Sequence, residues 1–190
     1  MATGAVVYEF PPYHDLSKTS EIANCIRYWI DEYIADGQEE PKILVELTGI
    51  FSDPKVRSKV IDSRGFTSVF LEKMDERRVA TLVCLLSNIE GSGIELKNCL
   101  TTAVIVSEYV RYWLNKYNDE PQDEARIIEK LKIVFDDTAI RRKILTGNAF
   151  GRIFREKIRE KRKPALKKLL QKINPGRFDA VDWRWTKHDD

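Results

Sequence analysis

Residues 42–74 read KILVELTGIFSDPKVRSKVIDSRGFTSVFLEKM, and residues 126–158 read RIIEKLKIVFDDTAIRRKILTGNAFGRIFREKI. The two stretches belong to a longer match without gaps, in which residues 25–89 align with residues 109–173 at an offset of 84. Of the 65 aligned pairs, 22 are identical, whereas roughly four identities are expected by chance at ordinary composition. The sequence therefore predicts an internal duplication, in which one supersecondary unit stacks on its copy. The shared positions include Arg27/Arg111, Tyr28/Tyr112, Trp29/Trp113, Leu47/Leu131, Phe51/Phe135, Phe66/Phe150, Phe70/Phe154 and Leu86/Leu170.

Apolar residues recur at helical spacing at the start of the first copy. Positions i, i+4, i+7, i+8 and i+11, counted from Ile22 to Tyr33, are all apolar and make one stripe along a helix. Gly37 and Pro41 predict the end of that helix, as Pro121 does in the second copy. No segment shows a sustained alternation of period two, so we expect essentially no sheet. The sequence predicts an all-α fold of about nine to eleven helices.

Turn signals divide the rest of each copy into short helices. In the first copy we expect helices over about 42–51, 54–62, 66–74 and 75–89. The signal Ser52-Asp53-Pro54 combines a capping oxygen with a proline in the first helical turn. Asp137-Thr138 holds the matching place in the second copy, where we expect the same helices.

Residues 47–89, LTGIFSDPKVRSKVIDSRGFTSVFLEKMDERRVATLVCLLSNI, resemble armadillo-type repeats. The resemblance rests on Asp53-Pro54, Val60-Ile61, Gly65, Leu85-Leu86 and Asn88, which occupy the positions that the repeat pattern requires. Half of the offset of 84 is 42, and armadillo units are about that long. The resemblance implies an armadillo/HEAT-like right-handed helical repeat of four imperfect units, arranged as two homologous multi-helix halves in tandem. It also implies a non-catalytic scaffold or adaptor that binds protein partners on a curved surface.

The resemblance carries one candidate binding residue, Asn88, because many armadillo proteins hold peptides with ladders of asparagine and tryptophan on the third helix. One turn before Asn88, however, the chain has Cys84 in place of tryptophan. The equivalent places in the second copy are Lys168 and Lys172. The usual ladder is therefore absent, and a groove on this protein must recognise its ligand differently.

We predict four segments: an extended N-terminal arm over 1–19, a first repeat half over 20–101, a second half over 102–175 and an aromatic tail over 176–190. The arm contains VVYEFPPY, in which Pro11-Pro12 favours an extended path. Trp183 and Trp185 lie in the tail, and tryptophans are frequent interface anchors. Both terminal segments have two interpretations, which are a cap over the neighbouring repeat and a partner-binding arm.

The two halves differ strongly in charge. Residues 20–94 contain 9 Lys/Arg and 13 Asp/Glu, which gives 9 − 13 = −4, whereas residues 104–178 contain 19 and 10, which gives 19 − 10 = +9. The same helical template therefore does not require the positive charge of the second half. One interpretation is a solvated face whose long stems cover apolar surface, and the other is a basic patch for an anionic partner. The candidate contacts are Arg141, Arg142, Arg152, Arg155, Arg159, Arg162, Lys168 and Lys172.

The functional hypothesis is an adaptor whose basic second half contacts an acidic protein partner. The alternative is a nucleic-acid-binding protein that recognises the phosphate backbone and assembles on its ligand. No helix-turn-helix or RNP signature accompanies the basic residues, which argues against sequence-specific reading. The opposite charges of the two halves also predict head-to-tail association between copies of the chain.

We expect neither catalysis nor a cofactor nor a metal. The two histidines, His14 and His188, lie in the predicted irregular termini, and no phosphate-binding, dinucleotide-binding, HExxH or nucleophile-elbow motif is present. Cys25, Cys84 and Cys99 have no CxxC spacing, which favours a reducing compartment and hence an intracellular protein, cytoplasmic or nuclear. We expect no secretory signal at the N-terminus, and no apolar run approaches the roughly 18 residues that a membrane-spanning helix needs.

Overall fold

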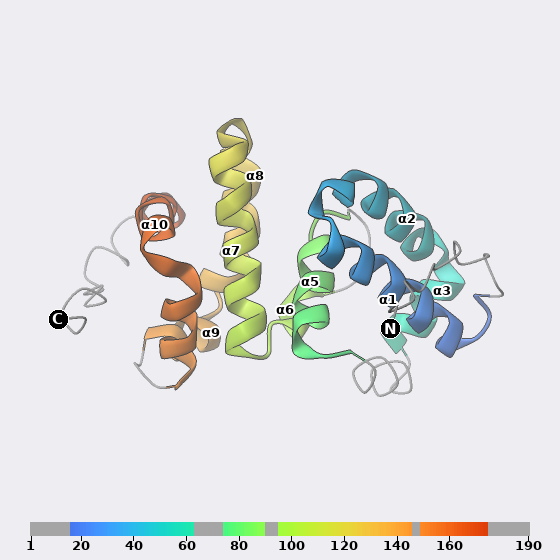
Figure 1. The fold of residues 1–190 in the computed structure, drawn as a ribbon. Helices are drawn as coiled ribbons and strands as arrows, with labels where there is room; N and C mark the ends of the chain where they lie inside the picture. Colours follow the sequence, from blue (N-terminus) through green and yellow to red (C-terminus); the bar gives the residue numbers. More distant parts are fainter. Residues whose placement is uncertain (1–15, 63–73, 90–94, 146–148, 175–190) are drawn as a thin grey trace, which may run out of the picture. The chain divides into compact units, whose positions relative to one another are not determined.

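A computed structural model describes residues 16–62, 74–89, 95–145 and 149–174, except for the side chains of residues 60–62, 159 and 160. All regular secondary structure in this part of the chain is helical, with nine α-helices, two 3-10 helices and no strand (Figure 1). The all-α prediction is confirmed. The helix expected over 66–74 and both predicted terminal segments, apart from residues 16–19, fall outside the described residues.

The described helices fall into two sets along the chain. The first half contains α1 (Thr19–Ala35), η1 (Gly37–Glu39), α2 (Glu40–Ser52), α3 (Pro54–Asp62) and α5 (Glu76–Leu86). The short α6 (Leu96–Cys99) precedes the second half. That half contains α7 (Ala103–Asp119), η2 (Pro121–Asp123), α8 (Glu124–Phe135), α9 (Thr138–Leu145) and α10 (Ala149–Ile173).

The element bounds of the two halves recur at the offset of the sequence match. Both ends of α7 coincide with those of α1 when the chain is shifted by that offset, and both ends of η2 coincide with those of η1. The helices α8 and α9 begin where the same shift places the starts of α2 and α3, and each ends within one position of the expected place. The capping residues explain this agreement: Asp53 Oδ1 accepts from the Lys55 amide at 2.7 Å, and Asp137 Oδ1 accepts from the Ala139 amide at 2.8 Å.

One cross-helix hydrogen bond also occurs twice at this offset. Arg78 Nε donates to Asp31 Oδ1 at 2.7 Å, which joins the start of α5 to α1. Arg162 Nε donates to Asn115 Oδ1 at 2.8 Å, which joins α10 to α7. In the sequence match, Arg162 aligns with Arg78, and Asn115 aligns with Asp31. The bond is an ion pair in the first half and a charged-to-neutral bond in the second.

The second half departs from the predicted set of short helices, because α10 runs through the place where a new helix begins in the first half. There, Asp75 Oδ1 accepts from the Arg78 amide at 2.9 Å and caps the start of α5. The equivalent residue is Arg159, and an arginine side chain has no acceptor atom with which to cap a helix. The chain therefore continues as one helix of 25 residues.

Pro164 lies inside α10 and explains a change of direction along it. A proline nitrogen carries no hydrogen, so Pro164 cannot bond to the carbonyl of residue 160, and its ring crowds that carbonyl. Figure 1 shows the ribbon of α10 bending between its first and last turns. The equivalent residue of α5 is Ala80, which imposes no such bend.

Helix packing divides the chain into two compact units, and the described residues of each unit share a core. One unit comprises residues within Met1–Arg78 and Asn88–Ile94, and the other comprises residues within Val79–Ser87 and Glu95–Asp190. These limits interleave, unlike the predicted repeat halves 20–101 and 102–175. The reason is that residues of α5 pack with α7, although the sequence match assigns α5 to the first copy.

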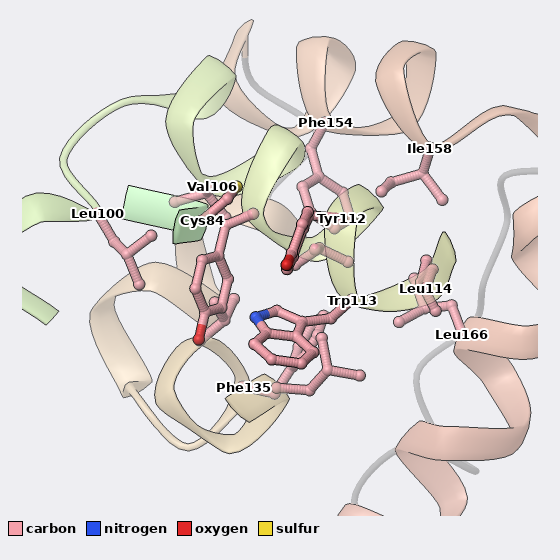
Figure 2. Packing of buried hydrophobic residues seen from close by; sticks show 14 of the residues in the cluster. Cys84, Leu100, Val106, Tyr112, Trp113, Leu114, Phe135, Phe154, Ile158 and Leu166 are labelled. Atoms are coloured by element: carbon pink, nitrogen blue, oxygen red, sulfur yellow. The ribbon is translucent and has the colours of Figure 1, made fainter. Parts of the chain in front are cut away.

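The core of the first unit is built from the apolar stripes of α1, α2 and α3. Its fully or nearly fully buried side chains are Ile22, Ile26, Trp29, Ile30, Ile43, Leu47, Ile50, Phe51 and Val56. The core of the second unit gathers around Trp113 of α7 (Figure 2). Phe135 of α8 and Phe154 of α10 are buried in the same cluster, together with Cys84 of α5.

Candidate functional site

The helices α9 and α10 approach each other closely where Gly151 meets Ile144. A Cβ atom placed on Gly151 would lie 2.5 Å from the Ile144 carbonyl oxygen, so only glycine allows this contact between the two backbones. Next to it, the Lys143 ammonium lies 5.9 Å from the centre of the Phe150 ring. Ile144 and Phe154 anchor the two helices in the core. The junction is therefore a rigid support for the residues beside it.

Four basic residues lie within four positions of Ile144 or Gly151 on these helices, and we call them the α9–α10 basic surface: Arg142 and Lys143 of α9, and Arg152 and Arg155 of α10. The side chains of Arg142, Lys143 and Arg152 are exposed, and that of Arg155 is half-buried. The sequence of α9 contains no carboxylate. Among the described side chains of α10, the one carboxylate is that of Glu156. The surface thus concentrates positive charge on two packed helices.

Two of the predicted contact arginines are used within the fold instead. Arg141 is half-buried, and its Nη1 donates to the Phe135 carbonyl at 3.2 Å, which satisfies the end of α8. Arg162 is also half-buried and makes the bond to Asn115 that ties α10 to α7. Both residues belong to the packing of the second unit more than to its surface.

Lys168 and Lys172 are exposed but also contact the rest of the second unit. The Lys168 ammonium lies 5.5 Å from the centre of the Tyr117 ring, and its contact with the Tyr117 hydroxyl raises the pKa of Lys168. The Lys172 ammonium pairs with Glu124, and this hydrogen bond is the main reason that the pKa of Glu124 is lowered. These lysines join the end of α10 to α7 and α8, away from the α9–α10 junction in sequence and in helix position.

Of the remaining predicted site residues, one lies elsewhere and the others are outside the described side chains. Asn88 is half-buried in the turn after α5, not on a helix, and it belongs to the first unit. Arg159 lies on α10 but its side chain is outside the described residues, as are Trp183 and Trp185. The sequence prediction missed Lys143. Its position beside Arg142, in the helix without carboxylates, was the available signal.

The described residues offer little chemistry beyond charge. No group of three or more His, Cys, Asp or Glu side chains among them could hold a metal ion. Burial raises the pKa of the Cys25 and Cys99 thiols, which lowers the fraction of reactive thiolate. Cys84 is buried in the core of the second unit. None of the described helices is both long and apolar enough to cross a bilayer.

No protein-family model matches the chain, and no curated protein or solved structure matches it either.

Proposed function

We propose that this protein is a non-catalytic intracellular scaffold with an armadillo-like duplicated fold, and that its α9–α10 basic surface binds an acidic segment of a protein partner. The observation that carries the proposal is the exposure of Arg142, Lys143 and Arg152 on two tightly packed helices with few carboxylates. The shared helical template does not require these arginines, because Arg142 and Arg152 correspond to Ser58 and Ser68 in the first copy.

The duplicated architecture is supported by burial as well as by the element bounds. Equivalent positions in the two halves are buried in both. They are Ile22/Val106, Ile26/Val110, Trp29/Trp113, Ile30/Leu114, Ile43/Ile127, Leu47/Leu131, Ile50/Val134, Phe51/Phe135, Val56/Ile140, Leu82/Leu166, Leu85/Leu169 and Leu86/Leu170. Repeated burial of this kind is what a stack of related helical units requires.

The chemistry of arginine fits an acidic peptide as the ligand. A guanidinium group binds a carboxylate through two parallel hydrogen bonds, and it remains charged at every physiological pH. The backbones of α9 and α10, which carry these arginines, are in direct contact at Gly151. Such a rigid surface loses little conformational entropy in its backbone when a partner binds.

Aromatic placement argues against nucleic acid as the main ligand. Proteins that bind single strands stack bases on exposed aromatic rings, but Phe154 is fully buried and Phe150 is half-buried beside Lys143. Phosphate contacts alone would remain for a nucleic acid, and these give affinity that falls steeply with salt. Nucleic-acid binding is therefore the second candidate.

Fluorescence anisotropy with two labelled probes tests the proposal. One probe is a Glu/Asp-rich peptide and the other is a single-stranded oligonucleotide of similar charge. We expect the wild-type chain to bind the peptide at moderate salt, and Arg142→Glu/Arg152→Glu to bind it at least about tenfold more weakly. Lys55→Glu/Lys132→Glu, which changes net charge equally at two other exposed lysines, should bind like wild type.

Two outcomes would contradict the proposal. Equal loss of peptide binding in both double variants would mean that net charge, not this surface, drives binding. Preferential binding of the oligonucleotide at moderate salt, with the same dependence on Arg142 and Arg152, would assign the surface to nucleic acid.

A further inference from the structure

The starting point is the way α5 packs on α7 within the second unit. Val83, Cys84 and Ser87 are buried to 2%, 4% and 1% exposure, and Cys84 and Ser87 interact with Tyr109, which is completely buried. Figure 2 shows Cys84 beside Val106 of α7. Burial, and to a lesser extent the neighbouring Cys84, raises the pKa of the Tyr109 hydroxyl. We call this contact the α5–α7 seam.

At the end of α10, the equivalent positions hold exposed polar and charged residues. In the sequence match, Val83, Cys84 and Ser87 correspond to Lys167, Lys168 and Gln171. All three are exposed, and we call them the α10 lysine face. The leucines of this segment remain buried, as in α5. The end of α10 thus has the same buried leucines as α5, but it has exposed lysines where α5 has buried apolar residues.

The other side of the seam has a counterpart at α1. Tyr109 corresponds to Cys25, and Ile105 corresponds to Glu21. Tyr109 also donates its hydroxyl to the carbonyl of Lys130 at 3.1 Å, and Lys130 corresponds to Glu46 of α2. Glu21, Cys25 and Glu46 are half-buried, and we call them the α1–α2 acidic face.

The Cys25 thiol and the Glu46 carboxylate interact electrostatically within the first unit. Burial is the main reason that the pKa of the Cys25 thiol is raised, and the Glu46 carboxylate raises it further. The corresponding side chains of the second half include an isoleucine, a tyrosine and a lysine. In the sequence match, the α1–α2 acidic face therefore takes the place of the α7 side of the seam. Its charge is opposite to that of the α10 lysine face.

We infer that a second copy of this chain binds here, with the α10 lysine face of one molecule on the α1–α2 acidic face of the next. The contact repeats the register of the α5–α7 seam. Lys167 and Lys168 take the places of Val83 and Cys84. Glu21 and Cys25 of the other molecule take the places of Ile105 and Tyr109. The interface is heterologous, so it generates rings or filaments. Since its attraction is ionic and near the surface, it weakens with salt.

This inference is independent of the proposed partner surface. The residues that carry it lie after Pro164 on α10 and on α1 and α2, whereas the proposed acidic partner contacts Arg142 and Arg152. Either conclusion can fail while the other stands.

Sedimentation velocity of the full chain over a wide range of concentrations at low ionic strength tests the inference. We expect the mean sedimentation coefficient to rise with concentration, and to return to the monomer value at about 0.5 M salt, where the Debye length is only a few ångströms. A monomer at all concentrations and low salt would overturn the inference.

Charge reversal on each face identifies the contact. Lys167→Glu/Lys168→Glu and Glu21→Lys/Glu46→Lys should each weaken association at least about tenfold. An equimolar mixture of the two variants should associate again, because each reversed face then meets an opposite charge on the other variant. Association that persists in both single preparations, or a mixture that stays monomeric, contradicts the proposed pairing.

Two further variants separate loss of contact from loss of fold. If Lys167→Glu/Lys168→Glu loses helical circular dichroism, Lys167→Glu/Gln171→Glu reverses the same face without disturbing the contact between Lys168 and Tyr117. Lys55→Glu/Lys132→Glu, which changes net charge by the same amount at exposed residues outside both faces, is the matched control and should associate like wild type. Alkylation of Cys25 should slow severalfold on association, and an unchanged rate in the associated sample would exclude the α1–α2 acidic face.

Discussion

The helix α5 and the last turns of α10 are aligned by the sequence match, yet they lie in different environments. Leu82, Leu85 and Leu86 are buried in α5, and Leu166, Leu169 and Leu170 are buried in α10. On the adjoining face, Val83 and Cys84 are buried in the core of the second unit, whereas Lys167 and Lys168 are exposed. The comparison teaches that the buried leucine stripe of a helix can stay the same while the residues on its adjoining face, which determine what packs there, change.

Aromatic truncation in equivalent core positions should have the largest effect. Phe51 and Phe135 are 1% and 2% exposed, so Phe51→Ala and Phe135→Ala should each destabilise the unit that contains them by about 3–5 kcal/mol. Urea unfolding followed by circular dichroism measures both. A cost below about 1 kcal/mol for either variant would show that its position is not equivalent to the other.

Two helical glycines should respond in opposite directions to alanine. Gly151→Ala should destabilise by about 1–3 kcal/mol, because its Cβ meets the Ile144 carbonyl. Gly49→Ala, on α2, should stabilise by about 0.5–1 kcal/mol, because its Cβ meets nothing within 4 Å and alanine favours helix. Thermal unfolding of the two variants distinguishes them, and a Gly151→Ala variant as stable as the wild type would refute the close contact between α9 and α10.

The helix caps of the two halves should differ in strength. Asp137 accepts from two amides and pairs with Lys97 at 3.2 Å, whereas Asp53 accepts from the Lys55 amide and is exposed. We expect Asp137→Ala to cost about 1–2 kcal/mol, and Asp53→Ala about 0.5–1 kcal/mol. Chemical denaturation at neutral pH gives both values, and the reverse order would contradict the comparison.

The same cap predicts a dependence on acid. The hydrogen bond from the Ile140 amide is the main reason that the pKa of Asp137 lies below its ordinary value of 3.8. A lowered pKa in the folded state means that the stabilisation is present above about pH 4 and is lost as the pH falls through the folded-state pKa. Below pH 4, the unfolding free energy of the wild type should therefore decrease more steeply than that of Asp137→Asn. Parallel curves would show that this carboxylate does not contribute.

The smallest expected effect concerns the repeated arginine bond. Asn115→Asp would convert the Arg162–Asn115 bond into an ion pair like that between Arg78 and Asp31. We expect a stabilisation of at most about 1 kcal/mol, because exposed and half-exposed ion pairs contribute little. The gain in stability should disappear in high salt. The reverse change, Asp31→Asn, should lower stability by a similar amount at low salt, and this loss should also disappear in high salt. A gain that salt does not change would indicate a packing effect.

Much of the helical layout could be predicted from sequence, because its signals are local. The predicted helix over 54–62 matches α3, and the predicted helix over 42–51 lies within α2, since Asp53, Pro41 and Pro54 fix the turns. The continuous α10 was missed because the alignment carried the first-half break into the second half. The arginine at position 159, opposite the capping Asp75, was the local sign that no helix starts there.

The candidate site was harder to predict than the fold. Sequence shows how many basic residues the second half contains, but not which of them other helices use. Arg141 and Arg162 bond to groups 6 and 47 residues away, and such contacts depend on tertiary packing. The contact between Arg78 and Asp31 would have suggested the bond between Arg162 and Asn115. Neither contact, however, can be predicted from the sequence.

The proline inside α10 also has a consequence for the timescale of local opening. A helix unfolds cooperatively because each hydrogen bond supports the next, and Pro164 removes one link from that ladder. The segment after it is held by its leucines and by the Lys172–Glu124 pair, so it can open while the earlier turns stay closed. Backbone amides on the two sides of Pro164 should therefore exchange their hydrogens with solvent as two separate groups.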